Sequence, residues 1–318
     1  MGVNRDTTAA TAPSTSREHR KATARAAGDR PTDLELYTST AIASAAPVIR
    51  RYSTSFKLAT SLFPPRCRSA ISSIYALVRV ADEIVDGTAE EAGLSRTERG
   101  ERLDEFERET ERAVETGFSA NLVIHAFAAV ARAARIEADL TRAFFSSMRR
   151  DLDDVQFGPE EYERYIHGSA EVVGLMCLRV FLMGHMRSAE ELAALEAGAT
   201  RLGAAFQKVN FLRDLGHDAG QLGRIYLPGT DPAALTEAQK HEVITDIAAD
   251  LDAAYLTVPL LPRDCRASVL VAADLFGELL RRIERTPASV LASTRVSVPN
   301  AVKTRIAVRR LVLRAGTR

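Results

Sequence analysis

Tryptophan is absent from this 318-residue sequence, and aromatic residues make up only 6% of it. Lysine and arginine together number 42, as do aspartate and glutamate, so the net charge gives no reason to expect a nucleic-acid partner. The six histidines include no pair spaced four apart that could hold a metal. No apolar run approaches the roughly 20 residues of a membrane-spanning helix. We therefore expect a cytoplasmic protein that does not bind nucleic acid.

Cysteine is also scarce. Cys67, Cys177 and Cys265 lie far apart in the sequence and match neither a metal-binding spacing nor a disulfide framework. We expect all three to behave as small buried apolar residues in a reducing compartment.

The first part of the chain lacks an apolar stripe. Residues 1–45 are rich in Thr, Ala, Ser and Arg and contain Pro13 and Pro31. No apolar stripe begins before Leu34. A signal peptide would need an apolar segment that is missing here. The composition predicts a disordered N-terminal tail, with a transit peptide as the alternative because arginines accompany many hydroxyl residues.

From residue 46 to residue 318 the pattern is helical. No proline occurs between Pro65 and Pro159, and apolar residues recur at spacings of three and four. Alternation typical of strands is missing, and Ala, Leu, Arg and Glu favour helices. The sequence predicts one all-α domain whose helices break at proline and glycine clusters, such as those at 63–65, 117–119 and 157–159.

Two carboxylate pairs stand out within this helical pattern. Tyr75, Arg79, Asp82 and Asp86 fall on one strip of a helix, so a phenol, a guanidinium and two carboxylates face the same way. A surface helix with an ion pair between Arg79 and Glu83 is the alternative interpretation. That alternative explains Glu83 but not two aspartates set among Val, Ala and Ile, and we favour the functional interpretation.

A second strip repeats the spacing. Gln207, Asn210, Asp214 and Asp218 share one helix face, with Arg213 beside it. Amide and carboxylate oxygens suit a hard divalent cation, and Mg²⁺ is typically shared between carboxylates and phosphates. The pattern indicates Mg²⁺, with Mn²⁺ as the alternative. Because the same segments carry apolar faces, two facing pairs would form a diphosphate site above an apolar cavity, as a long hydrocarbon diphosphate requires.

Four motifs in order carry a resemblance. They are Tyr52-Ser-Thr-Ser-Phe56, Asp82-Glu-Ile-Val-Asp86, the segment from Tyr165 to Gly174, and the segment from Asn210 to Pro228. Together they resemble the squalene/phytoene synthase family of head-to-head prenyl-diphosphate synthases, and bacterial phytoene synthases most of all. The resemblance runs from about Tyr52 to the C-terminus. It implies an all-α helical bundle of the isoprenoid synthase type with a central active-site cavity.

The chain departs from the family pattern at four positions. Thr54 stands where Lys is frequent, Glu83 stands for an Asp, and His217 replaces a frequent Glu. Glu171 occupies a usual Gly position inside an apolar helix. It is either an extra polar group near the substrate or a satisfied buried acid, and the sequence leaves both open.

The resemblance also implies roles for individual residues. Metal binding falls to Asp82, Asp86, Asn210, Asp214 and Asp218, and the four aspartates are catalytic. Tyr75 and Tyr165 are the other catalytic candidates, for positioning diphosphate or accepting a proton, although each could simply pack. Substrate diphosphate is expected at Ser53, Ser55, Arg79, Gln207, Asn210, Arg213, Arg224 and Tyr226.

The activity that the resemblance implies is head-to-head condensation. Two geranylgeranyl diphosphates would form a cyclopropyl (prephytoene) diphosphate and then phytoene, the first committed step of carotenoid biosynthesis, without NADPH. The alternative within the family makes squalene, presqualene diphosphate or dehydrosqualene from farnesyl diphosphate, and squalene requires NADPH. A catalytically silent member acting as an assembly factor is the alternative of another class, although such a member should lose metal-binding aspartates. The second motif of a class I terpene cyclase is not seen.

The last stretch of the chain is basic. Residues 295–318 contain seven lysines and arginines and no acid, with Ile306, Val308 and Leu311 among an apolar set. A basic amphipathic helix can lie on an anionic membrane, so peripheral membrane contact is one expectation. A final bundle helix with a solvated basic face is the other, and the two are compatible.

Overall fold

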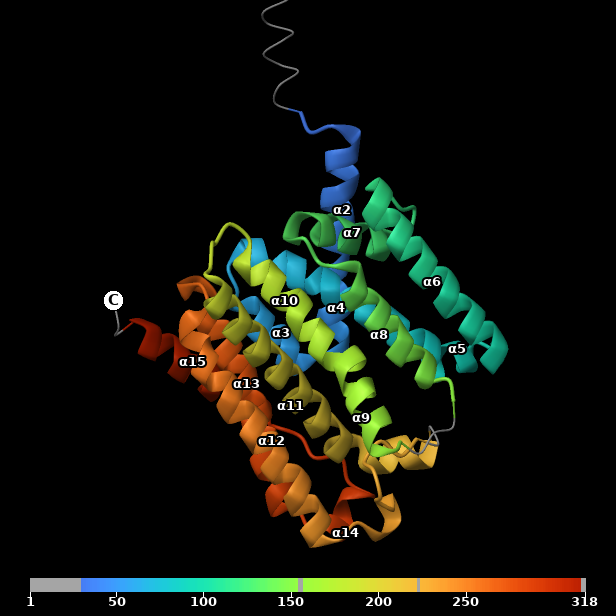
Figure 1. The fold of residues 1–318 in the computed structure, drawn as a ribbon, viewed down its shortest axis with the longest axis vertical. Helices are drawn as coiled ribbons and strands as arrows, with labels where there is room; N and C mark the ends of the chain where they lie inside the picture. The colour runs from blue at the N-terminus through green and yellow to red at the C-terminus, as the bar shows by residue number, and fades with distance from the viewer. Residues whose placement is uncertain (1–29, 154–156, 222–223, 316–318) are drawn as a thin grey trace, which may run out of the picture.

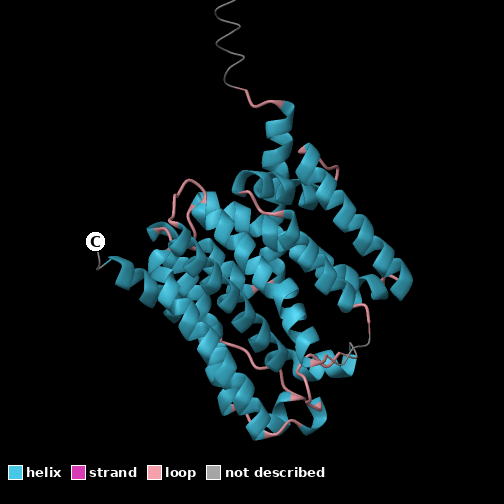
Figure 2. Ribbon diagram, in the orientation of Figure 1, coloured by secondary structure: helices cyan, strands magenta, loops and turns pink. Residues whose placement is uncertain are grey.

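A computed structural model describes residues 30–153, 157–221 and 224–315. Within these ranges the chain is helical and contains no β-strand (Figures 1 and 2), so the all-α prediction is confirmed. The helices pack into a bundle in which α4, α10 and α11 are central. Helices α6, α7 and α8 lie on one side of them and α12, α13 and α15 on the other (Figure 1).

The helices of the first half are α2 (Asp33–Tyr52), α3 (Thr54–Ser61), α4 (Pro65–Val85), α5 (Gly87–Glu91), α6 (Arg96–Thr116), α7 (Leu122–Ala134) and α8 (Ala138–Arg150). Those of the second half are α9 (Pro159–Ile166), the π-helical turn η1 (His167–Glu171), α10 (Val172–Leu182), α11 (Ala189–Gln221), the 3₁₀ turn η2 (Pro232–Ala234), α12 (Glu237–Thr257), the 3₁₀ turn η3 (Val258–Leu260), α13 (Arg263–Arg285), α14 (Ala288–Leu291) and α15 (Asn300–Ala315).

Proline and glycine set several helix ends as expected. Pro65 is the first residue of α4 and Pro159 the first of α9, where the missing amide hydrogen costs nothing. Gly117 ends α6 with a φ of 81°, a left-handed conformation that other residues adopt at a cost. These breaks separate the long helices that carry the functional residues.

The predicted tail ends too late in the sequence. Helix α2 begins at Asp33, so the boundary at residue 45 is wrong for residues 33–45, while residues 1–29 lie outside the described part. Thr32 and Glu35 form a capping box in which each side chain accepts a hydrogen bond from the other residue's backbone N–H, at 3.2 and 2.7 Å. The helix then buries Ala41 and Ala45 against α4 and α7. Within residues 33–45 the buried side chains of this helix are alanines, which hydrophobic patterning does not reveal.

Two large apolar clusters form the core. One joins α4, α6, α7, α8 and α10, and the other joins α9, α11, α12 and α13. Cys67 and Cys265 are fully buried, as expected, and their Sγ atoms lie 3.6 Å apart between α4 and α13. Cys177 is half-buried.

One helical run is more apolar than expected. Pro159–Leu182, taken through α9, η1 and α10, is long and apolar enough to cross a membrane by length and composition alone. It is not an uninterrupted apolar run, because it contains charged residues such as Glu171 and Arg179, and a buried core helix passes the same test. This run packs against α4, α8 and α11 and provides one wall of a cavity, which explains its apolar composition.

Small residues bring that run close to α11. A Cβ added to Gly174 would lie 2.5 Å from the Ala199 carbonyl oxygen, and one added to Gly203 would lie 2.6 Å from the Ala170 carbonyl oxygen. Both distances are shorter than real contacts. The backbones of η1, α10 and α11 therefore touch directly at the glycines, and Val173 and Leu202 beside them line the cavity.

Candidate active site

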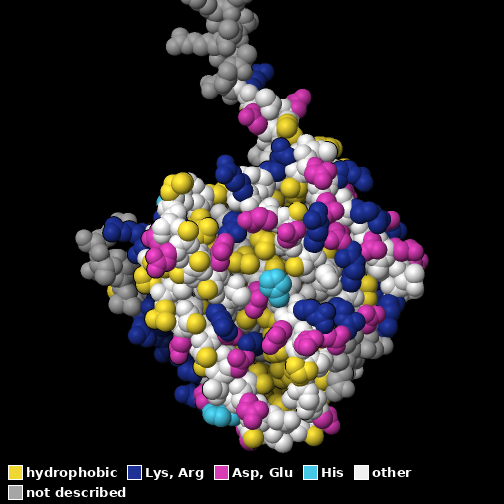
Figure 3. Space-filling model, viewed as in Figure 1, with side chains coloured by type: hydrophobic (Ala, Val, Ile, Leu, Met, Phe, Trp, Pro, Cys, Tyr) yellow, Lys and Arg dark blue, Asp and Glu magenta, His cyan; other side chains and the backbone are white. Residues whose placement is uncertain are grey.

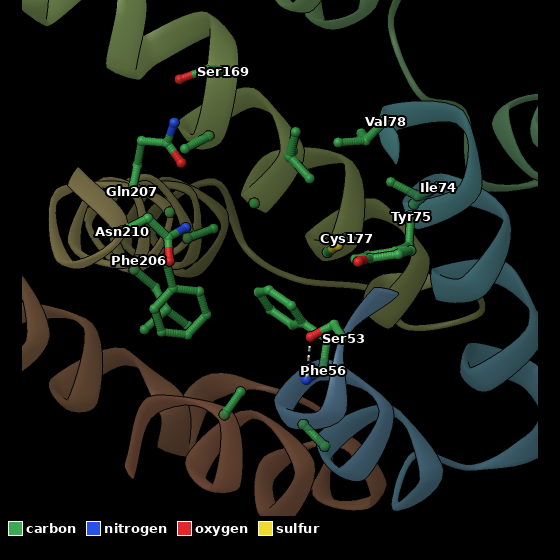
Figure 4. Close-up of a pocket in the computed structure, with 18 of the residues that line it drawn as sticks. Ser53, Phe56, Ile74, Tyr75, Val78, Ser169, Cys177, Phe206, Gln207 and Asn210 are labelled. Atoms are coloured by element: carbon green, nitrogen blue, oxygen red, sulfur yellow. Dashed lines mark hydrogen bonds between the residues drawn. The ribbon is translucent and has the colours of Figure 1, made fainter. Parts of the chain in front are cut away.

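A cavity of about 520 Å³ lies between the two apolar clusters. Its walls come from α3, α4, η1, α10, α11 and α13. Figure 4 shows Phe56 of α3, Tyr75 of α4 and Asn210 of α11 reaching into it from three sides. The volume falls within the range of ligand pockets for small molecules.

The first predicted strip lies along this cavity. Tyr75, Arg79 and Asp82 project from α4 and line the wall. Asp86 also lines it, but it lies one residue beyond the end of α4, where its backbone N–H donates to the Asp82 carbonyl at 2.7 Å. The two aspartates are therefore neighbours, although only the first is inside the helix.

Arg79 makes the ion pair that the alternative interpretation foresaw. Its Nε donates to Glu83 Oε1 at 2.6 Å, and its guanidinium lies 4.4 Å from the centroid of the Tyr52 ring. A nitrogen of the same group lies 4.0 Å from an Asp82 oxygen. Arg79 thus lines the cavity and pairs with Glu83 at once, and the two interpretations are not exclusive.

The second strip lies along the same cavity on α11. Gln207, Asn210, Asp214 and Asp218 all line it, and Arg213 stands beside them. Arg213 Nε donates to both oxygens of its neighbour Asp214 at 3.0 Å. The structure therefore brings together the two carboxylate pairs, which lie more than 120 residues apart in the sequence.

An arginine missed by sequence reasoning completes this end of the cavity. Arg295, in the segment between α14 and α15, donates from Nε to Asp214 Oδ1 at 2.7 Å and lines the cavity. The basic composition of the last stretch was the only signal for it. Two guanidiniums thus donate to Asp214, one from α11 and one from the segment before α15.

Arg224 connects the two motifs. It is only 6% exposed, and its Nη1 donates to Asp86 at 2.7 Å while its Nη2 donates to the Val85 carbonyl at 3.1 Å. Its backbone N–H donates to the Asp218 carbonyl at 2.9 Å. The loop after α11 is therefore tied to the end of α4 by a buried, charge-assisted hydrogen bond.

A buried carboxylate, Asp151, is the other residue that the sequence did not reveal. The hydroxyls of Tyr165 and Tyr226 each donate to it at 2.9 Å, and the nearest Arg224 nitrogen is 3.8 Å away. Asp151 lies just after α8, in a run of mixed charges without a helical partner, so no spacing pointed to it. Together with Asp82 and Asp86 it adds a third carboxylate to this side of the cavity.

The carboxylates differ in their electrostatic environments. Burial, reinforced by Asp86, raises the pKa of Asp82 well above its usual range. Burial and the nearby Asp214 raise the pKa of Asp218 to about 6, and burial raises that of Asp151 to about 7 despite Arg224. Burial opposes ionisation of Asp214 as well, but hydrogen bonds from Arg213 and Arg295 outweigh it and lower its pKa. Ionisation of Asp82, Asp151 and Asp218 is therefore less favourable than usual without a cation, and a bound cation would favour their ionised forms.

The phenols in the cavity are donors. Burial raises the pKa of Tyr75 to about 12, and it raises the pKa values of Tyr165 and Tyr226 well above their usual range. All three therefore keep their protons at neutral pH. The rings of Tyr165 and Tyr226 also pack against Phe157 and Phe211, so their placement in the aromatic cluster is fixed on several sides.

The remaining predicted residues are placed less directly. Ser53 lines the cavity, and its hydroxyl accepts from the Phe56 N–H at 3.1 Å as the N-cap of α3 (Figure 4). Ser55 is half-buried on α3 and is not among the residues that line the cavity. Glu171 does not line it either. It pairs with His167 at 2.9 Å, and of the two alternatives it is the satisfied acid.

The donor set fits a hard divalent cation shared with a ligand. Asn210 Oδ1 is buried and has no hydrogen-bond partner among the described residues, so an oxygen acceptor is left free inside the site. Within the same described part, no three His, Cys, Asp or Glu side chains gather closely enough to hold an ion alone. Mg²⁺ usually binds through one or two carboxylates and completes its shell with water and phosphate oxygens. Two separate pairs of carboxylates and the free Asn210 oxygen suit this way of binding Mg²⁺.

Residues 49–302, four-fifths of the chain, match the squalene/phytoene synthase family. The chain belongs to this family, whose members act on prenyl diphosphates. A phytoene synthase of Thermus thermophilus is 34% identical over 194 residues, covering 57% of each protein. One from Rhodobacter capsulatus is 29% identical over 252 residues, covering 73% of this chain and 70% of the relative.

Coverage of the relatives is partial. A bifunctional lycopene cyclase/phytoene synthase of Colletotrichum graminicola is 27% identical over 297 residues, covering 82% of this chain but 50% of its own length. The chain thus spans about half the length of that relative and of the Thermus protein.

Solved structures support the fold. A dehydrosqualene synthase superposes with a TM-score of 0.73 at 24% identity, covering 88% of this chain and 99% of the other. A squalene synthase from Alicyclobacillus acidocaldarius gives 0.66 at 20% identity, covering 82% and 98%. The isoprenoid-synthase type of fold is therefore confirmed.

Proposed function

We propose that this protein is a Mg²⁺-dependent phytoene synthase, which joins two geranylgeranyl diphosphates head-to-head. The observation that carries the proposal is one cavity that has two carboxylate pairs at one end and apolar walls along the rest. Curated relatives named phytoene synthases support the choice within the family.

The charged end would bind the diphosphates. Asp82, Asp86, Asn210, Asp214 and Asp218 would hold Mg²⁺, with Mn²⁺ as the alternative ion. When bound, the cation supplies the positive charge that makes diphosphate a good leaving group. Arg79, Arg213 and Arg295 line this end and can donate to diphosphate oxygens, whose charge grows as the allylic C–O bond breaks. Gln207, Arg224 and Tyr226 add donors nearby.

The tyrosines hold protons at defined atoms. The Tyr165 hydroxyl donates a hydrogen bond to Asp151, and Tyr165 lines the cavity. The double bond of the second substrate attacks the first allylic cation, and loss of a proton closes the cyclopropane ring. Asp151 and Tyr165 form a buried pair that could accept and relay that proton, because burial raises the pKa of Asp151 to about 7. A second ionisation, rearrangement and proton loss would give phytoene without a reductant.

The apolar walls would exclude water from the cations. Phe56, Phe206 and Tyr75 line the cavity, and the centroid of the Phe56 ring lies 6.1 Å from that of Tyr75 and 6.0 Å from that of Phe206. A water molecule would attack an allylic cation, so the lining must exclude water if the second substrate is to react with the cation first. Most of the lining that α10 and α11 add is small or aliphatic, and Phe63 and Phe181 contribute two further rings.

The length of the apolar wall suits a long chain. Nineteen positions of α11 separate Asp214 from Leu195, both of which line the cavity, and at 1.5 Å per residue this makes about 28 Å. An extended geranylgeranyl chain reaches about 19 Å at roughly 1.2 Å per main-chain bond. A geranylgeranyl chain that starts near Asp214 would therefore end before it reaches Leu195.

Product analysis tests the proposal. Purified protein is incubated with Mg²⁺ and geranylgeranyl diphosphate, or farnesyl diphosphate, each with and without NADPH, and the lipids are identified by mass. We expect phytoene from geranylgeranyl diphosphate without NADPH. Squalene, presqualene diphosphate or dehydrosqualene from farnesyl diphosphate alone would replace the proposal by its family alternative.

Substitution separates an enzyme from a silent assembly factor. Asp82→Asn and Asp214→Asn should each abolish turnover while helicity stays intact. Asp252→Asn, at an exposed position of α12 outside the cavity, is the matched control and should leave turnover unchanged. Cellular function that survives both active-site substitutions would point to the assembly role instead.

A further inference from the structure

The charges of this neutral chain are unevenly distributed. Neither 36–81 nor 286–318 contains an aspartate or glutamate, although charged residues make up 26% of the sequence. Both stretches contain lysines and arginines. Elsewhere the two signs are interspersed, as the face in Figure 3 shows.

The fold places the two acid-free stretches against each other. Helix α15 packs on α3 and α13, with Ala307 buried in a small apolar cluster that includes Leu58 and Leu62. Lys303 Nζ on α15 donates to Thr54 Oγ1 on α3 at 2.6 Å. Asp274, which α13 presents to α15, is already engaged by Arg310 at 2.6 and 2.7 Å. The adjacent α3 and α15 thus expose cations without exposing acids of their own.

The outward side of α15 mixes cationic and apolar side chains. Arg305, Val308, Arg309 and Val312 are spaced at three and four and are all exposed, so they form one stripe along the helix. Val308 is 52% exposed and Val312 is 64% exposed. Neither arginine has an acidic partner within the described part of the chain. On α3, Lys57 is exposed as well.

This surface continues to the charged end of the cavity. Tyr52 lines the cavity yet is 51% exposed, and it directly precedes the N-cap of α3. Arg295 lines the same end, five residues before α15 begins. An apolar ligand that passes between a bilayer and the cavity here would cross little open water.

We propose that this α3–α15 surface docks on an anionic phospholipid bilayer; its residues are Thr54, Lys57, Ser61, Arg305, Val308, Arg309, Leu311 and Val312. The valines and leucine would enter the boundary of head groups and acyl chains, while the cations lie at the level of the phosphates. The proposed docking rests on the residues of this surface alone and does not depend on which prenyl diphosphate the protein condenses.

Vesicle sedimentation tests the docking. Full-length protein is mixed with vesicles of phosphatidylcholine alone or with one third phosphatidylglycerol, and the bound fraction is measured at low and high salt. We expect binding to the anionic vesicles that weakens at high salt, and little binding to the neutral ones. Arg305→Glu with Arg309→Glu should weaken binding about tenfold or more, since each cation near such a surface contributes on the order of 1 kcal/mol. Val308→Ser with Val312→Ser should weaken it too.

A charge-matched control lies on the other side of the bundle. Arg108 and Arg112 are exposed on α6, far from α15 in Figure 1, and Arg108→Glu with Arg112→Glu makes the same charge change. This control should bind anionic vesicles as the parent does. All variants are checked by thermal melting and by turnover of detergent-dispersed substrate, which should not change, because none of these residues lines the cavity.

Three outcomes would overturn the proposal. The first is equal loss of binding in both charge-reversed variants, which would indicate a net-charge effect. The second is binding to neutral vesicles as strong as to anionic ones. The third is no vesicle binding at all, which would leave the surface to an acidic protein partner. Because the readout is binding, failure here and failure of the proposed condensation can be told apart.

Discussion

At the scale of single residues, Asp151 has no place in the two aspartate pairs, yet it connects more of the site than any of them. It accepts hydrogen bonds from two phenols and faces the guanidinium of Arg224, which in turn binds Asp86. A carboxylate that fixes the groups around a metal-binding site usually affects activity nearly as much as a ligand does. Its position suggests that it orients Tyr165 and Tyr226.

We therefore predict that Asp151→Asn lowers turnover about 10-fold to 100-fold while the protein stays folded. The amide has nearly the same shape, but it offers one acceptor oxygen to phenols that both donate. Turnover and far-UV circular dichroism check this. Asp153→Asn is the matched control, because Asp153 is 55% exposed two residues away and should tolerate the change. Equal activity of the two variants would contradict the orienting role.

The dependence of activity on Mg²⁺ should change with pH. Burial and Asp214 raise the pKa of Asp218 to about 6, so below about pH 6 this group binds a proton in place of a cation. The Mg²⁺ concentration for half-maximal activity should rise as pH falls from 7.5 to 5.5. Asp218→Asn should need more Mg²⁺ at both pH values and lose much of the dependence. A half-maximal concentration that stays constant in the parent protein would refute the assignment.

Spacing alone anticipated the residues that share a helix face. The residues of each strip line the cavity together because helical periodicity fixes which side chains of one helix point the same way. That the two strips face each other depends on how α4 and α11 pack. Asp151 and Arg295 were missed because each reaches the site from outside a long helix. Their placement depends on how distant segments pack, which periodicity does not encode.

At the scale of helices, the contact between α11 and the run of η1 and α10 determines the shape of the cavity. Gly174 and Gly203 let the backbones touch, and the π-helical turn shifts the register of the side chains that follow. Proline and glycine in the sequence predicted where most long helices end. They did not predict the π-helical turn, which depends on packing between helices. They also did not predict the start of α2 at Asp33, which the local capping box of Thr32 and Glu35 sets.

Gly203→Ala should therefore destabilise the protein. Its Cβ would lie 2.6 Å from the Ala170 carbonyl oxygen, and forcing the helices apart costs about 1–3 kcal/mol. Gly277→Ala on α13 is the matched control, because nothing lies within 4 Å of the added Cβ. That change should stabilise the fold by up to about 1 kcal/mol through helix propensity. Urea unfolding measures both, and a neutral Gly203→Ala would mean that the helices move apart freely.

At the scale of the whole molecule, the cavity separates the two large apolar clusters, one built around α4 and the other around α11. Arg224 ties them at the charged end. Folding raises the pKa of Asp218 above its unfolded value of about 3.9, so the folded state holds more protons and stability falls as pH rises from about 4 to 6. At neutral pH the ligand-free protein thus keeps Asp214 and Asp218 ionised, and the two carboxylates repel each other on α11.

A ligand that bridges the two carboxylate pairs should then stabilise the entire fold. We predict that Mg²⁺ with inorganic pyrophosphate raises the unfolding temperature at pH 7.5 more than either alone, because only the pair can connect α4 to α11. Ligand at about 100 times its dissociation constant contributes about 2.7 kcal/mol. Asp82→Asn with Asp214→Asn should abolish the shift, and Asp252→Asn should keep it. The prediction would fail if the unfolding temperature of the double variant rose as much as that of the parent. It would also fail if pyrophosphate raised it fully without Mg²⁺. In either case the ligand would not bind through the carboxylate pairs.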